Sequence, residues 1–146
     1  MHTDIWFNAL ALRPGGSGVQ TYIRELLKAL ADDTTLVLTA AVQSDAVVEL
    51  PNTVHPDERP TCAGIRRALQ GLRPISEFDV VHGLDVDLPL RNAGAAAVAT
   101  VHDCAVVDVP WAFPAHRARA ERLLLARTAR RADVIVTPSA FTAERV

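Results

Sequence analysis

The chain has 146 residues, and its 15 basic and 17 acidic residues give a formal net charge of −2. A chain of this length fits one folded domain, and a content of 49% hydrophobic and 22% charged residues excludes a disordered protein. The near-neutral charge excludes recruitment to nucleic acid by an overall positive field. No apolar run reaches the roughly 18 residues of a membrane-spanning helix.

The first third of the chain predicts two strands with a helix between them. Residues 4–10 form a short apolar run with aromatic side chains, which is typical of a buried strand. The loop 13–18 contains three glycines, and the spacing of Ser17 and Gln20 predicts a capping box at the start of a helix. Residues 35–42 predict the second strand. The apolar side chains of the helix form one stripe: Val19, Tyr22, Ile23, Leu26, Leu27 and Leu30.

The middle of the chain is less regular. Residues 43–60 contain three prolines, so any strand there is expected to be short. A short helix is predicted over residues 61–72, and apolar runs predict strands over 79–82 and 95–101. A proline- and aromatic-containing loop is expected from there to residue 114.

The last third predicts an arginine-rich helix over residues 115–131 and a strand over 134–137. Ser139 and Thr142 then open a further helix with the spacing of an N-cap. Strands that alternate with helices indicate an α/β fold with a largely parallel sheet, in one domain over residues 1–146.

Ligands of such sheets bind beyond the carboxyl ends of the strands. We therefore expect the loop 15–18, His82 with Gly83, and His102 with Asp103 to lie along one edge. Free N–H groups at a helix start attract anions, so Gly15, Gly16, Ser17 and Gly18 are candidates for binding a phosphate, although a tight turn explains them equally well. The loop is not a Walker loop, because no Gly-Lys-Ser/Thr follows it.

His102 and Asp103 follow a predicted strand directly. A histidine there titrates near neutral pH and can exchange hydrogen bonds with a ligand, while Asp103 can orient it or bind a hydroxyl group. The alternative is that the pair caps the strand and holds the next loop. Cys104 suggests a Cys–His nucleophile, but a buried structural cysteine is favoured because no further catalytic partner is identified.

For two charged features we favour an explanation as solvated surface over a functional one. Asp85 and Asp87 form a D-x-D triplet that, with His82, suggests a metal-dependent transferase, but a solvated acidic loop explains it. The arginines of residues 115–131 are spread around the helix, as on a solvated surface, with attraction to anionic lipid headgroups as the alternative. The basic residues of 65–73 add a second small cluster.

Four motifs in this order resemble the N-terminal domain of the GT-B-fold glycosyltransferases of family 4, which use nucleotide sugars. They lie at residues 15–30 (GGSGVQTYIRELLKAL), 79–83, 98–103 with the trailing 110–114, and 131–142, which is similar to the family pattern ADRIITVSEFT. The similarity covers nearly the whole chain. It implies a Rossmann-like parallel sheet flanked by helices.

The resemblance also implies a retaining sugar transfer that needs no metal and no cofactor besides the nucleotide-diphosphate sugar donor. The backbone amides of the loop 15–18 would bind the donor diphosphate, and His102 would approach the donor sugar near the reacting centre. His82, Gly83 and Asp103 would lie close to the acceptor, which is expected to be a sugar, a lipid-linked compound or another small molecule.

The family has a second Rossmann-like domain whose paired glutamates bind the donor, and this chain has no such pair. We therefore expect residues 1–146 to be the acceptor-side half of a longer enzyme, weak or inactive without its C-terminal partner domain. A non-catalytic α/β binding or partner-docking domain is the alternative. Two cysteines without a C-x-x-C pair predict a cytoplasmic location, with the inner face of the cell membrane as a further option.

Overall fold

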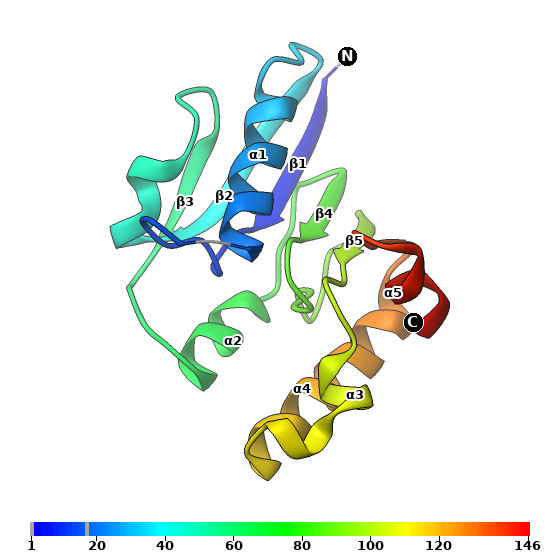
Figure 1. Ribbon diagram of the computed structural model, residues 1–146. Coiled ribbons are helices and arrows are strands. Elements are labelled where there is room, and N and C mark those ends of the chain that lie inside the picture. Colours follow the sequence, from blue (N-terminus) through cyan, green and yellow to red (C-terminus); the bar gives the residue numbers. More distant parts are fainter. Residues whose placement is uncertain (1, 17) are drawn as a thin grey trace.

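The computed structural model describes residues 2–16 and 18–146. Within them, six parallel strands form one sheet in the order β3-β2-β1-β4-β5-β6 (Figure 1). The strands are β1 (Thr3–Asn8), β2 (Leu36–Gln43), β3 (His55–Arg59), β4 (Val80–Gly83), β5 (Ala96–Thr100) and β6 (Val134–Val136). This is the predicted α/β, Rossmann-like arrangement, and the strand order reverses between β1 and β4.

Helices connect the strands as the sequence pattern predicts, with three short additions. The α-helices are α1 (Val19–Ala31), α2 (Ile65–Gly71), α3 (Ala105–Asp108), α4 (Ala115–Arg131) and α5 (Ala140–Arg145), and the 3₁₀ turns are η1 (Ser44–Glu49) and η2 (Pro110–Ala112). The segments α3 and η2 occupy the stretch that we expected to be a loop. None of the helices in the described residues is both long and apolar enough to cross a bilayer.

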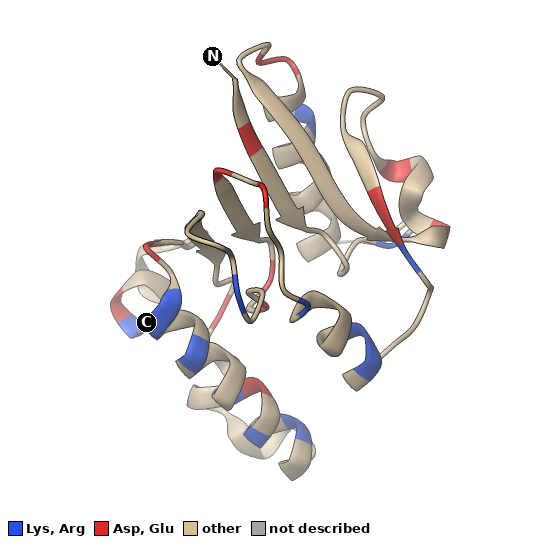
Figure 2. Ribbon diagram, turned by 180° about the vertical axis from the view of Figure 1, so that it is seen from behind, with Lys and Arg blue, Asp and Glu red and all other residues tan. Residues whose placement is uncertain are grey.

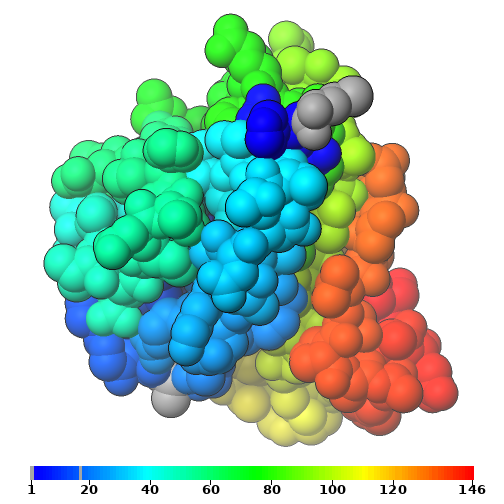
Figure 3. Space-filling model, turned by 90° about the horizontal axis from the view of Figure 1, so that it is seen from above, coloured from blue at the N-terminus to red at the C-terminus, as the bar shows by residue number. Residues whose placement is uncertain are grey.

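The two faces of the sheet carry separate apolar clusters. Helix α1 covers one face, where Ile23 and Leu27 pack against Phe7. The opposite face is centred on Trp6 and Val81. The view from above the sheet places the β3 segment and the C-terminal segment on opposite sides of the molecule, as expected for the two edges (Figure 3).

The capping box predicted at the start of α1 depends in part on Ser17. The N-cap is Gly18, no side chain of the described residues caps the helix, and the Gln20 amide donates to the Ala11 carbonyl at 3.3 Å. Ser17 itself lies outside the described residues. The cap predicted for the last helix is confirmed, since the Thr142 N–H donates to the Ser139 hydroxyl at 3.1 Å.

Candidate functional site

The carboxyl ends of β1, β4 and β5 lie at one edge of the sheet, which we call the carboxyl edge. The chain leaves β4 through Leu84, and the Leu84 carbonyl accepts a hydrogen bond from Nε2 of His102 at 2.9 Å. The ring of Tyr22, from the first turns of α1, meets the His102 ring edge-on at 5.0 Å. The end of β4, the first turns of α1 and His102 therefore meet near the point where the strand order reverses, and the loop 15–18 leads directly into α1.

The glycine loop links β1 to α1. Gly15 and Gly18 have φ values of 65° and 63°, a region that favours glycine because it has no Cβ. The Arg24 guanidinium holds the loop, donating to the Gly16 carbonyl at 2.5 Å and to the Arg13 carbonyl at 3.4 Å. The first N–H groups of α1 lack partners within the helix, as at any helix start, and this arrangement suits an anion.

The hydrogen bond of His102 fixes which ring nitrogen carries the proton. A carbonyl oxygen only accepts hydrogen bonds, so Nε2 of His102 is the donor to Leu84. In the neutral ring, Nδ1 is then free to accept a hydrogen bond from a ligand. The main chain is held as well, because the Thr142 hydroxyl donates to the His102 carbonyl at 3.4 Å.

The ring of the half-buried His82 contacts core residues. Its Nε2 lies 3.0 Å from the hydroxyl oxygen of Thr100, a fully buried residue, and its ring packs against Phe7 at 5.6 Å. Desolvation by burial lowers the pKa of His82 from 6.5 to about 4, so the ring is neutral at pH 7. Nε2 of His82 is thus already bonded inside the protein.

Gly83 and Asp103 have different surroundings. A Cβ atom on Gly83 would lie 2.6 Å from the carbonyl oxygen of Asp87, so only glycine fits where the β4 loop folds back. Asp103 is exposed, and its Oδ1 accepts from the Ala105 N–H at 2.9 Å, which holds the turn into α3. Cys104 is buried as favoured above, and this burial raises the pKa of its thiol.

The acidic triplet is partly enclosed between α2 and α4. Asp85 lies 3.8 Å from the Arg67 guanidinium, whereas Asp87 is only 7% exposed. Burial, followed by repulsion from Asp85, raises the pKa of Asp87 from 3.8 to about 6. Among residues 2–16 and 18–146, no three His, Cys, Asp or Glu side chains are grouped so that they could hold a metal ion.

These two shifts predict opposing pH dependences of stability. The unfolded chain loses the Asp87 proton first, so the stability from protonated Asp87 is lost as the pH rises from about 4 to about 6. The unfolded chain binds the His82 proton first, so the stability from neutral His82 is lost as the pH falls from about 6.5 to about 4. Asp85, Glu121, Arg67 and Arg127 surround Asp87 and modulate its titration.

Asp87→Asn removes the titration of Asp87, so the pH dependence of stability should then follow His82. We expect the free energy of unfolding of this variant to rise by roughly 2 kcal/mol between pH 4 and 6.5, more steeply than in the unchanged chain. His82→Gln should show the reverse trend, with stability falling as the pH rises. Urea unfolding across this pH range measures both variants, and parallel curves for all three proteins would contradict the assignment.

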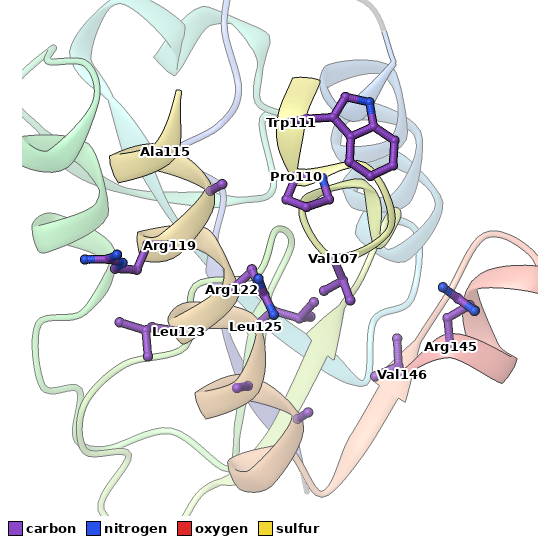
Figure 4. A pocket seen from close by; sticks show the side chains of 13 residues that line it. Val107, Pro110, Trp111, Ala115, Arg119, Arg122, Leu123, Leu125, Arg145 and Val146 are labelled. Atoms are coloured by element: carbon purple, nitrogen blue, oxygen red, sulfur yellow. The ribbon is translucent and has the colours of Figure 1, made fainter. Parts of the chain in front are cut away.

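The arginines of α4 have different environments. Arg127 donates to the carbonyls of Leu88 and Pro89, both at 2.7 Å, and so supports the loop after β4. Arg122 lines an open groove of about 790 Å³ beside the highly exposed Trp111 (Figure 4). Figure 2 shows basic segments along both α2 and α4.

The sequence did not point to Tyr22 or Thr100 as parts of the site. Tyr22 belongs to the apolar stripe of α1, and Thr100 ends an apolar strand, so both patterns predict core residues. A polar side chain at the buried end of a strand is the available signal, because a buried hydroxyl requires a partner.

Comparison with known protein families identifies the family of this chain. The family model of Glycosyltransferase Family 4 matches residues 16–146. No curated protein and no solved structure gave a match. The chain therefore belongs to glycosyltransferase family 4.

Proposed function

We propose that residues 1–146 form the acceptor-side domain of a retaining glycosyltransferase, which transfers a sugar from a nucleotide-sugar donor to an acceptor. The observation that supports this proposal, beside family membership, is the convergence of Leu84, His102 and Tyr22, from the helix that follows the glycine loop, at the carboxyl edge. A parallel sheet binds its ligands at this edge where the strand order reverses.

The donor diphosphate would bind at the glycine loop. The loop precedes α1, a helix of 13 residues whose dipole and free N–H groups favour negative charge at its start. Gly15, Gly16, Ser17 and Gly18 would offer backbone N–H groups to the leaving diphosphate without a metal ion. The Gly16 N–H, which donates to the Arg13 carbonyl at 3.3 Å, would exchange that bond for one to the diphosphate. No cofactor other than the donor substrate is proposed.

His102 would act at the donor sugar. With Nε2 donating to Leu84, its Nδ1 is the atom that can accept a hydrogen bond from a sugar hydroxyl near the reacting centre. Gly83 would shape the acceptor side by letting the chain fold back, and Asp103 would offer a carboxylate. His82 would contribute from beneath through Thr100.

A second, donor-binding domain would complete the enzyme, and we expect little transfer without it. The acceptor would be a sugar, a lipid-linked compound or another small molecule, and nucleic acid is not proposed. A lipid-linked acceptor would suit the exposed Ile65 and Leu69 on α2, which lie beside Arg66, in a cytoplasmic enzyme that touches the inner face of the membrane.

The first test is a screen of nucleotide sugars and acceptors against the gene product that includes the coding sequence downstream of residue 146. Transfer that needs both this chain and a downstream domain with paired glutamates supports the proposal. Binding of a partner without any transfer would instead favour the non-catalytic docking domain. A requirement for Mn²⁺ would favour the metal-dependent alternative at Asp85 and Asp87.

Gly16→Val tests the donor loop. A Cβ at Gly16 would lie 2.6 Å from Cγ of Gln20, so the variant narrows the loop and displaces Gln20. We expect the donor KM to rise about tenfold while the melting temperature changes little. Adding Gln20→Ala removes the two closest contacts, at Cγ and Cδ, and leaves only the one to Cβ at 3.0 Å. Recovery of donor use in the double variant would therefore favour a plain structural turn over a diphosphate site.

A further inference from the structure

The hydrogen-bonded side chains of Tyr22 and Thr100 join α1 to the carboxyl edge. The Tyr22 hydroxyl lies 3.1 Å from the Thr100 hydroxyl, which in turn lies 3.0 Å from Nε2 of His82. The Tyr22 ring in turn contacts the His102 ring edge-on. We propose that Tyr22 and Thr100 are positioning residues that hold His102 in the orientation required for sugar transfer, an inference that rests on the proposed function.

The sheet geometry places these groups on one face. Phe7 pairs with His82, and His82 pairs with Val98, so all three side chains point to the face that α1 covers. Thr100 follows Val98 by two residues and therefore points the same way. Tyr22 reaches this face from the helix above it.

The Thr100 hydroxyl uses both its donor and an acceptor site on its two neighbours. A hydroxyl has one proton to donate and also accepts, so it can donate to one of Tyr22 and His82 and accept from the other. Because Thr100 is fully buried, water does not replace a lost partner without cost. The neutral ring of His82, kept uncharged by burial, suits either direction of the bond.

His102 is thereby restrained from two sides. The Leu84 carbonyl fixes Nε2, and the Tyr22 ring meets the imidazole at an angle of 84°. Together these contacts fix the direction in which Nδ1 points. Tyr22 also couples this restraint to the glycine loop, because its own N–H donates to the Gly18 carbonyl at 3.1 Å.

The test measures the order of the His102 ring directly. In the chain labelled at its five histidines, ¹³C relaxation of the His102 Cε1–H group reports ring motion, with His102→Gln identifying the signal. We expect a rigid ring in the unchanged chain and fast motion in Tyr22→Leu. Tyr22→Phe keeps the edge contact but loses the Thr100 bond, so it should give an intermediate result.

Leu26→Ala is the matched control. Leu26 lies on α1 and packs against the core cluster of Phe7, so its truncation weakens the helix packing without removing a contact to His102. This control should lower stability and leave the His102 ring rigid. If Tyr22→Leu also leaves the ring rigid, or if Leu26→Ala loosens it equally, the positioning role is overturned.

Kinetics of the two-domain enzyme separate this inference from the proposed function. Tyr22→Leu should lower kcat about 10- to 100-fold with little change in the acceptor KM, as expected when a reacting group is misplaced. The double variant Tyr22→Phe/Thr100→Val should lose no more kcat than the worse single variant, because both substitutions break the same Tyr22–Thr100 hydrogen bond. Additive losses of kcat would count against a role for this hydrogen bond. If Tyr22→Leu frees the ring but His102→Ala leaves transfer intact, positioning stands and the proposed function fails.

Discussion

Replacing His102 with alanine is expected to reduce sugar transfer by about 10²- to 10³-fold in the enzyme that pairs this chain with a donor-binding domain. The variant removes Nδ1, the atom available to the donor sugar, and it also frees the Leu84 carbonyl from its 2.9 Å hydrogen bond. Because an interaction made mainly in the transition state affects turnover, kcat should fall more than the donor KM rises.

The matched control for this loss is His116→Ala. His116 is an exposed histidine at the start of α4, so its removal tests for effects of losing any imidazole. We expect wild-type transfer from the control and unchanged circular dichroism from both variants. Wild-type turnover of His102→Ala would show that His102 has no catalytic role.

The elements that the sequence predicted well have strong periodicity. The stripe from Val19 to Leu30 identifies α1 because six apolar residues follow the 3.6-residue repeat. Strand β3 has no comparable signal, since His55–Arg59 consists of polar residues and a proline. It forms because it is an edge strand that pairs only with β2, where Pro56 is tolerated.

The helical turns after Asp103 were missed for a related reason. Helix α3 has only four residues, Ala105–Asp108, and it is too short for a periodic pattern. It forms because the Asp103 carboxylate accepts from the Ala105 N–H and because α3 packs against α4. A tertiary contact of this kind is not visible in the local sequence.

For the candidate site, the sequence predicted the edge but not the side-chain directions. The carboxyl ends of parallel strands must share one edge, so His82 and His102 could be placed near each other. The His82 ring turns toward the core, where its hydrogen-bond partner is Thr100, 18 residues away in the sequence. The sequence pattern alone does not pair these two residues.

The largest loss of stability among variants of the site is expected from Gly83→Ala. The backbone of Gly83 lies outside the left-handed region, so alanine meets no φ strain there. The new Cβ would instead lie 2.6 Å from the Asp87 carbonyl oxygen and 3.1 Å from that of Asp85, and backbone atoms cannot move aside as a flexible side chain does. We expect the free energy of unfolding to fall by roughly 3 kcal/mol.

Thermal and urea unfolding of the chain measure this change, with Gly64→Ala as the contrasting control. Gly64 has a φ of 58° and a ψ of −134° with open space around it, so its substitution meets backbone strain of roughly 1–3 kcal/mol but no steric contact. A loss from Gly83→Ala of less than about 1 kcal/mol would mean that the loop after β4 yields easily and that the close approach at Gly83 carries little energy.

Gly83→Ala should also change the orientation of the His102 ring. Displacing the loop after β4 moves Leu84, the residue directly after Gly83, and its carbonyl holds Nε2 of His102. Gly83→Ala should therefore loosen the His102 ring in relaxation measurements at temperatures where the variant is still folded, whereas Gly64→Ala should leave it rigid. Loss of stability with an unchanged ring would separate the packing role of Gly83 from the orientation of His102, because the Leu84 carbonyl would then have kept its place.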